Sequence, residues 1–295
     1  MRNATSIFCI AALLLVPAAV SANMEFSGNA SYTYNDNISN AINNRDIFSD
    51  QAIEINFNGG KLWLPAVGKS IFLQGNLGAV KHSDAEGLDE YSYGTTLSYV
   101  QRFGLGAYAP RIGLSLGASK RDVKTDMRDG WLYRAGVTLE KRFTPAWHAS
   151  ATLTREKRTA DADKTLSYYD QIPSDVFNQD NNELSAAIDY TLENNSVLTA
   201  RYLFRDGEIS ASTNPASNFF FSTSAVAQDY EICDACGDYV AYLVDAKIHS
   251  LLLDWNWALG NDSSVSTGYE RRIARTRGDN TYTSHIFRIQ LNRRF

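Results

Sequence analysis

Long apolar stretches are scarce in this 295-residue sequence. The first 22 residues hold the one extended run, "IFCIAALLLVPAAV", between Arg2 and the small residues "VSA". This pattern is typical of a secretory signal peptide, and we expect cleavage after Ala22. No later window offers about 20 uncharged apolar residues in succession, the length that a transmembrane helix needs. The sequence therefore excludes membrane-spanning helices and predicts a mature chain of residues 23–295.

Proline and cysteine are also rare, with six and three residues respectively. No proline-rich or Gly/Ser-rich linker interrupts the chain, which favours a single domain. Cys9 lies in the expected signal peptide, so Cys233 and Cys236 are the cysteines of the mature chain. Their C-x-x-C spacing fits a redox motif or half of a zinc site, but neither a βαβ pattern nor further ligands accompany it. In an oxidising compartment, we expect these two cysteines to form a local disulfide.

Aromatic residues are plentiful: 16 Tyr, 14 Phe and 5 Trp. They recur in segments where apolar and polar residues alternate, the period of a β-strand. In "YSYGTTLSYVQRF", for example, Tyr91, Tyr93, Leu97 and Tyr99 share one face. Twelve such segments follow one another, each about long enough to cross a bilayer at a tilt. The second is "AIEINF" and the tenth is "YLVDAKIHSLLLDWNWAL".

The connections between these segments alternate in length. "GGKLWLPAVGK", "GLGAYAP", "TPA", "ENN" and "GND" are compact, whereas the intervening connections are more polar and often longer. The two longest span roughly residues 159–182 and 207–240. Short turns at one end and long loops at the other predict a closed antiparallel transmembrane β-barrel of about 12 strands. An even strand number would place both termini at the short-turn end, which we expect to be periplasmic.

The last strand, "HIFRIQLNRRF", places Phe287, Ile289, Leu291 and Phe295 on its apolar face, with Arg293 as an exception. Together with the signal peptide and the alternating strands, this ending resembles Gram-negative outer-membrane β-barrel proteins. The resemblance implies that the C-terminal strand is an insertion signal for the barrel-insertion machinery. It also implies a location in the cell outer membrane, in contact with membrane lipid and lipopolysaccharide.

The strand faces opposite the apolar ones should point into the barrel, and they carry more arginine than acid. Charged pore linings select the opposite charge, and the arginine fork suits carboxylates and phosphates. We therefore expect a passive channel that favours small anionic solutes, and the architecture is similar to twelve-stranded porins for acidic oligosaccharides. The pore-lining candidates are Arg102, Arg111, Arg134, Arg142, Arg201, Arg272, Arg288, Glu140 and Glu270.

A filled interior is the alternative, because Arg–Glu pairs on neighbouring strands can simply occupy a lumen of this size. The opening "YNDNIS" resembles the start of barrels that accompany envelope polysaccharide or lipoprotein export. A structural or assembly barrel with a filled lumen therefore stays open as a second function. The segment is short, and Asp36 and Asn37 are equally suited to a turn.

The sequence predicts neither an enzyme nor a cofactor, metal or nucleic-acid site. His148 and Ser150 have the two-residue spacing used by outer-membrane phospholipases, but their parity points inward and they follow a short turn. Two further expectations concern local structure. The change of apolar parity in the tenth strand predicts a β-bulge near Ile248–Leu251. Phe219, Phe220 and Phe221, in the longest loop, should pack within the loop, constrict the pore or contact a partner.

Overall fold

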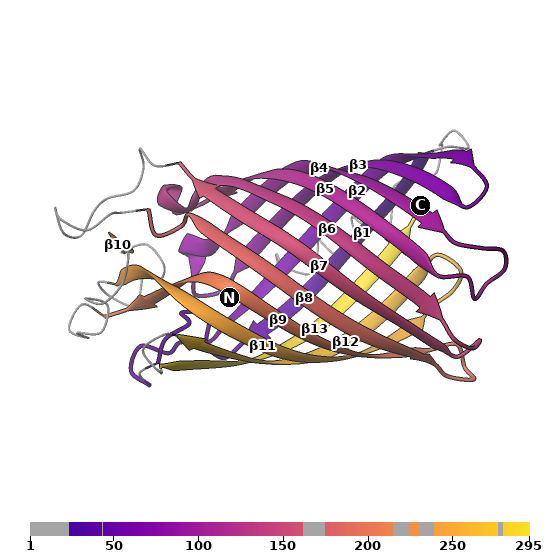
Figure 1. Ribbon diagram of the computed structural model, residues 1–295. Coiled ribbons are helices and arrows are strands. Elements are labelled where there is room, and N and C mark those ends of the chain that lie inside the picture. The colour runs from indigo at the N-terminus through magenta and orange to yellow at the C-terminus, as the bar shows by residue number, and fades with distance from the viewer. Residues whose placement is uncertain (1–23, 43, 162–174, 215–224, 230–238, 277–279) are drawn as a thin grey trace.

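A computed structural model describes residues 24–42, 44–161, 175–214, 225–229, 239–276 and 280–295. Twelve long antiparallel strands form a closed wall, as the alternation predicts (Figure 1). They are β1 (Met24–Asn35), β2 (Asp50–Ala66), β3 (Lys69–His82), β4 (Glu90–Arg102), β5 (Arg111–Val123), β6 (Gly130–Arg142), β7 (Trp147–Ala160), β8 (Gln179–Thr191), β9 (Val197–Thr213), β11 (Val240–Ala258), β12 (Ser263–Thr276) and β13 (Thr281–Arg294).

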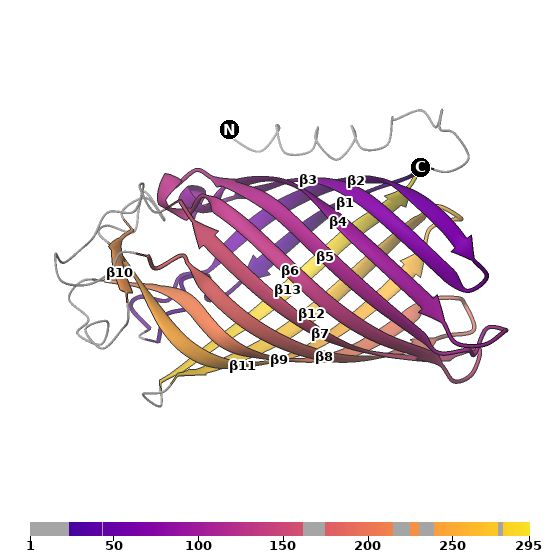
Figure 2. The same cartoon turned by 45° about the horizontal axis from the view of Figure 1, so that its top comes forward.

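Two pairings close the ring. The first strand pairs with the last, β13, and β9 pairs with β11 across the longest connection. Every wall strand therefore has a hydrogen-bonded neighbour on each side, and the sheet has no free edge along the wall. The turns between strands gather at one end of the barrel, at the right in Figure 1, and the long connections at the other. The C-terminal end lies at the short-turn end in both views (Figures 1 and 2).

The outer surface is apolar along the middle of the strands. Leu77, Leu116, Leu139, Leu153 and Ile289 are each more than half exposed, and they belong to different strands. A soluble protein rarely exposes apolar side chains so extensively, because contact with water is unfavourable. Lipid is the solvent that suits this surface, and a closed barrel satisfies the backbone hydrogen bonds that lipid cannot. The wall is thus a transmembrane barrel.

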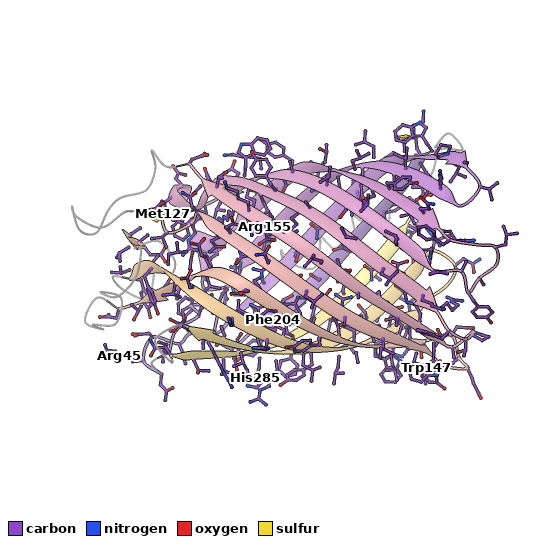
Figure 3. The ribbon with its side chains drawn as sticks, viewed as in Figure 1. Arg45, Met127, Trp147, Arg155, Phe204 and His285 are labelled. Atoms are coloured by element: carbon purple, nitrogen blue, oxygen red, sulfur yellow. The ribbon has the colours of Figure 1, made fainter. Side chains whose placement is uncertain are left out.

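Aromatic side chains flank the apolar band near the short turns. The rings of Trp147 and Tyr190 lie 4.6 Å apart, and those of Trp255 and Trp257 lie 4.3 Å apart. Figure 3 shows Trp147 at this end of the molecule. Amphipathic rings prefer the boundary between lipid tails and headgroups, so these pairs mark that level of the barrel.

Three details differ from the sequence-based expectations. Residues 59–66 continue β2, so the turn to β3 is Val67–Gly68 and the ladder irregularity lies between Trp63 and Ala66. The bulge predicted near Ile248–Leu251 was wrong, because β11 pairs regularly with both β9 and β12 through this stretch. A short additional strand, β10 (Ala225–Gln228), pairs with β11 and was not predicted.

The described helices are single 3-10 turns, η1 (Glu86–Leu88) and η2 (Asp126–Arg128), in the connections that follow β3 and β5. None of the helices in the described ranges is long and apolar enough to cross a membrane.

Candidate functional site

The nine pore-lining candidates all occupy strand positions opposite in parity to the exposed apolar side chains. On β6, for instance, Tyr133 and Leu139 are exposed on the outside, and Arg134 and Glu140 have the other parity. Arg102 and Arg142 lie at the last positions of β4 and β6, at the short-turn end. The remaining members follow the same alternation: Arg111, Arg201, Glu270, Arg272 and Arg288.

Many interior charges form ion pairs between neighbouring strands. Glu156 of β7 is 8% exposed and accepts a 2.7 Å hydrogen bond from Nε of Arg134, its cross-strand partner on β6. Arg205 of β9 lies 3.5 Å from the same carboxylate and 3.1 Å from Glu183 on β8. These contacts join four consecutive strands at one level of the barrel. Within this group, the charges largely balance.

Two further ion pairs between arginine and glutamate lie on the inward face. Arg121 binds Glu90 on the neighbouring β4, with Nε 2.8 Å from Oε1, and Arg272 binds Glu270 on its own strand at 3.0 Å. Glu90 and Glu183 were not among the acids predicted to face inward. Their parity could have revealed them, since Glu90 alternates with Tyr91 and Tyr93, which are exposed on the outside.

Four arginines of the predicted set have no ion pair among the described residues: Arg102, Arg142, Arg201 and Arg288. Arg201 and Arg288 reach toward Asp254 of β11, with which both interact electrostatically. Arg201 is an exposed residue of the wall although its parity is inward, so its guanidinium group faces open space inside the barrel.

That space includes a cavity of about 360 Å³ against β9, β11 and β12. Volumes of this size are usual for small-molecule sites. The charged lining comprises five arginines and three glutamates: Arg128, Arg158, Arg201, Arg205, Arg272, Glu183, Glu208 and Glu270. Positive side chains therefore outnumber negative ones around this cavity.

A three-stranded arm borders the cavity through Glu208, Ile209 and Ser210. We define the arm as residues 208–213, 225–229 and 239–245, the described ends of β9 and β11 together with β10. In the wall, β9 also pairs with β8 up to Gly207, and β11 also pairs with β12 from Ala246 onward. Beyond the Gly207–Ala246 rung, the two strands pair only with each other and with β10 among the described residues.

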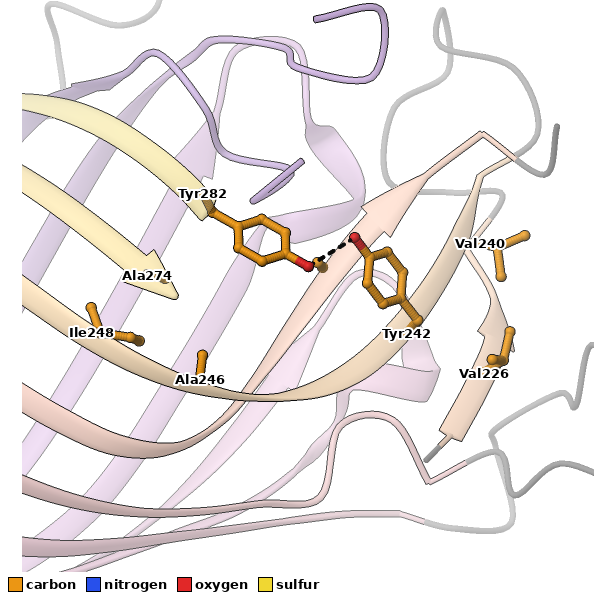
Figure 4. Close-up of a cluster of buried hydrophobic side chains, with 8 residues drawn as sticks. Val226, Val240, Tyr242, Ala246, Ile248, Ala274 and Tyr282 are labelled. Atoms are coloured by element: carbon orange, nitrogen blue, oxygen red, sulfur yellow. Dashed lines mark hydrogen bonds between the residues drawn. The ribbon is translucent and has the colours of Figure 1, made fainter. Parts of the chain in front are cut away.

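One face of the arm packs against the wall and the first loop. Tyr242 is 1% exposed and its hydroxyl lies 3.3 Å from that of Tyr282 on β13 (Figure 4). Val226, Ala246 and Ile248 belong to the same cluster, and Ile42 of the loop after β1 covers it. The apolar parity change in β11 therefore reflects an inner face that is apolar at this end and covered by protein. This explains why no bulge is needed.

The other face of the arm packs against the segment before β8 and against η2. Val176 and Phe177 form a buried cluster with Ala225 and Ala227 of β10, and Met127 of η2 packs against it. Arg128 donates from Nη2 to Oδ2 of Asp229 at 2.7 Å, and its guanidinium group lies over the ring of Phe177. Asp229 is fully buried, so this ion pair links the arm firmly to the loop after β5.

Tyr239 connects the arm to loops on the opposite side of the long-loop end. Its ring meets that of Phe48 edge-on at 5.9 Å, and Leu88 of η1 packs beside them. The loop holding Leu88 precedes β4, which lies six strands from β11 in the ring of twelve. Burial raises the pKa of the Tyr239 hydroxyl, and the nearby charge of Asp46 raises it further. The arm thus spans the long-loop end from one side to the other.

The remaining predicted sites have the following positions. Phe287, Ile289 and Leu291 lie on the outer face of β13, and the Phe295 N–H donates to the carbonyl of Phe26 at 2.9 Å. His148 is bound through Nδ1 to Asp189 at 2.8 Å, near the short turns. Phe219, Phe220, Phe221, Cys233 and Cys236 lie outside the described residues, as does the expected signal peptide. Within the described ranges, no group of three or more His, Cys, Asp or Glu side chains could hold a metal ion.

Comparison with known proteins relates the chain to outer-membrane barrels by fold. No family model and no curated sequence matches it. An outer-membrane channel from Pseudomonas putida F1 aligns over 95% of this chain and 100% of its own, with a TM-score of 0.59 and 11% identity. The KdgM porin in complex with disordered oligogalacturonate aligns over 91% and 99% of the two chains, with a TM-score of 0.45 and 10% identity.

An outer-membrane phospholipase from Salmonella typhi aligns over 96% of both chains, with a TM-score of 0.48 and 9% identity. The match to the Pseudomonas putida channel supports the fold assignment. The chain has the fold of an outer-membrane β-barrel, closed by twelve antiparallel strands.

Proposed function

We propose that the protein is a diffusion channel of the outer membrane that favours small anionic solutes. The observation that carries this proposal is the cavity beneath the arm, where five arginines face three glutamates. Arg201 is the central residue, because it is exposed to the cavity and has no ion pair among the described residues. Charges that line a pore attract ions of the opposite sign, and a narrow, protein-walled space strengthens their effect.

The second candidate, a structural barrel with a filled lumen, also has support. The Arg134–Glu156–Arg205–Glu183 group occupies interior volume with nearly balanced charge, and the arm covers one mouth. A filled barrel would show no conductance, whereas a channel would conduct through the space that these groups leave. Conductance in planar lipid bilayers therefore separates the two functions.

Ion selectivity tests the role of the arginines. Replacement of Arg134, Arg201 and Arg272 by glutamine should lower the ratio of anion to cation permeability. The matched control replaces Arg155, Arg271 and Arg275, which carry the same charge on the outer face of β7 and β12. Reversal potentials should shift toward cation permeability in the first variant and stay unchanged in the control. Equal reversal potentials in both variants and the native protein would contradict a charge-selective interior.

A further inference from the structure

Two arginines border the cavity directly beneath the arm. Arg128 ends η2, and Arg158 lies close to the end of β7. The Nη2 group of Arg158 donates to the main-chain carbonyl oxygen of Arg128 at 2.5 Å, which holds the Arg158 side chain against the main chain of Arg128. The Nε atoms of both residues are buried and have no hydrogen-bond partner in the part of the chain that the structure describes. Buried donors of this kind are normally satisfied.

The charges around Arg158 leave it without a dedicated counter-ion. Its electrostatic neighbours are Arg121 and Arg128, which repel it, and Glu90 and Glu156, which attract it. Both carboxylates are already engaged, since Glu90 binds Arg121, and Glu156 binds Arg134 and Arg205. No carboxylate of the described residues lies within ion-pair distance of Arg158 itself. A buried positive group in this position is stabilised by an added negative charge.

We propose that Arg128 and Arg158 form a binding site for an oxyanion, the phosphate, sulfate or carboxylate group of a solute inside the barrel. The inference rests on the proposed anion-favouring function and assigns it a particular site. Guanidinium groups bind such oxygens through short, charge-assisted hydrogen bonds. The cavity of about 360 Å³ has room for a small solute, and Gln179, Ser210 and Asn40 offer neutral polar contacts there. Glu183 and Glu208 border the same cavity, so a solute with one compact anionic group fits better than a polyanion.

The site is coupled to the arm through Arg128. Its Nη2 group binds the buried Asp229, which also accepts a 2.7 Å hydrogen bond from the hydroxyl of Ser212. A bound oxyanion and the Asp229 carboxylate therefore share the positive charge of one guanidinium group, and each weakens the attraction of that group for the other. Occupation of the site weakens the link between the arm and the loop after β5, and loss of that link favours anion binding.

Isothermal titration calorimetry with inorganic phosphate tests the site on the full-length protein in detergent micelles. The native protein should bind phosphate with saturation. Arg158→Gln should weaken binding about tenfold, because one charge-assisted donor group is lost. The matched control, Arg155→Gln, removes the same charge from the outer face of the same strand and should bind as the native protein does. Asp229→Asn should bind several-fold more tightly, because the competing carboxylate is gone.

Three results would overturn the site. These are the absence of saturable binding by the native protein, equal losses in Arg158→Gln and Arg155→Gln, and unchanged or weaker binding by Asp229→Asn with native-like heat stability. If Asp229→Asn loses heat stability, Ser212→Ala replaces it, since it removes only one hydrogen bond to Asp229. The Asp229 carboxylate then depends more strongly on Arg128, so weaker phosphate binding by that variant is expected, and unchanged or tighter binding opposes the coupling. Calorimetry does not require the protein to conduct, so this test of the site remains valid even if the protein is not a channel. Anion selectivity without phosphate binding would refute the site and leave the channel function standing.

Discussion

Gly207 of β9 pairs with Ala246 of β11 at the rung where the barrel wall ends and the arm begins. On either side of this rung, Gly207 pairs with Asn181 and Ala246 pairs with Thr276. Above it, Asn181 replaces the lost ladder partner, because its Oδ1 atom accepts the Glu208 N–H at 2.9 Å. A Cβ atom on Gly207 would lie 2.3 Å from that same oxygen, so glycine is needed for this departure.

Gly207→Ala should therefore loosen the arm while the wall keeps its strands. The added methyl group forces Asn181 away from Glu208, and overpacking of this kind typically costs about 1–3 kcal/mol. Limited proteolysis should show faster cleavage near residues 208–213 and 240–245. Gly75→Ala is the control, since a Cβ atom there meets only ordinary contacts at 3.8 and 4.0 Å. Equal cleavage of both variants would count against a glycine-dependent exit from the wall.

Tyr242→Ala should open the mouth. The side chain is 1% exposed and joins the arm to Tyr282, so its removal leaves a cavity at the centre of the cluster. Truncation of a buried aromatic residue costs about 3–5 kcal/mol in general, which should loosen the contact between the arm and β13. Single-channel conductance should rise. Tyr202→Ala, on the outer face, should leave conductance unchanged, and the same value for both variants would show that the arm does not limit ion flow.

Glu156→Gln should lower stability and raise anion selectivity together. The carboxylate serves both Arg134 and Arg205, and its loss leaves two guanidinium groups without their shared partner. Glu156 is buried whereas Arg134 is largely exposed, so the loss should cost about 1–3 kcal/mol, the usual range when a hydrogen-bonded partner is removed. Urea-induced unfolding in lipid vesicles measures the first effect and reversal potentials measure the second. In the control Glu140→Gln, the carboxylate is more exposed than Glu156 and pairs with Arg111 alone, so stability should change by less than about 1 kcal/mol.

The wall was predictable from sequence because a membrane barrel imposes one simple rule on every strand. Lipid contact requires apolar side chains at alternate positions. In a strand such as "YSYGTTLSYVQRF", the apolar positions therefore identify the face that points outward. The strand number and the antiparallel closure followed from this rule and from the alternating lengths of the connections. Both predictions are confirmed.

The arm was not predictable, because its strands leave the lipid-facing wall and the alternation of apolar residues there no longer identifies a lipid-facing side. Tyr242, Val244, Ala246 and Ile248 are apolar and covered by other protein segments, so their parity no longer reports the lipid face. The ion pairs were equally hidden, since register between strands decides which Arg meets which Glu. Alternation alone gives the face of a side chain and not its partner.

The zero-current potential of the native protein in a roughly tenfold KCl gradient tests the central claim most directly. Potassium and chloride have similar mobilities in water, so the sign of the potential reports the selectivity of the pore. An anion-favouring interior lets chloride pass to the dilute side, which should become negative, and the potential should shrink at high salt as charges are screened. A dilute side that becomes positive, or the absence of any conductance, would contradict the account.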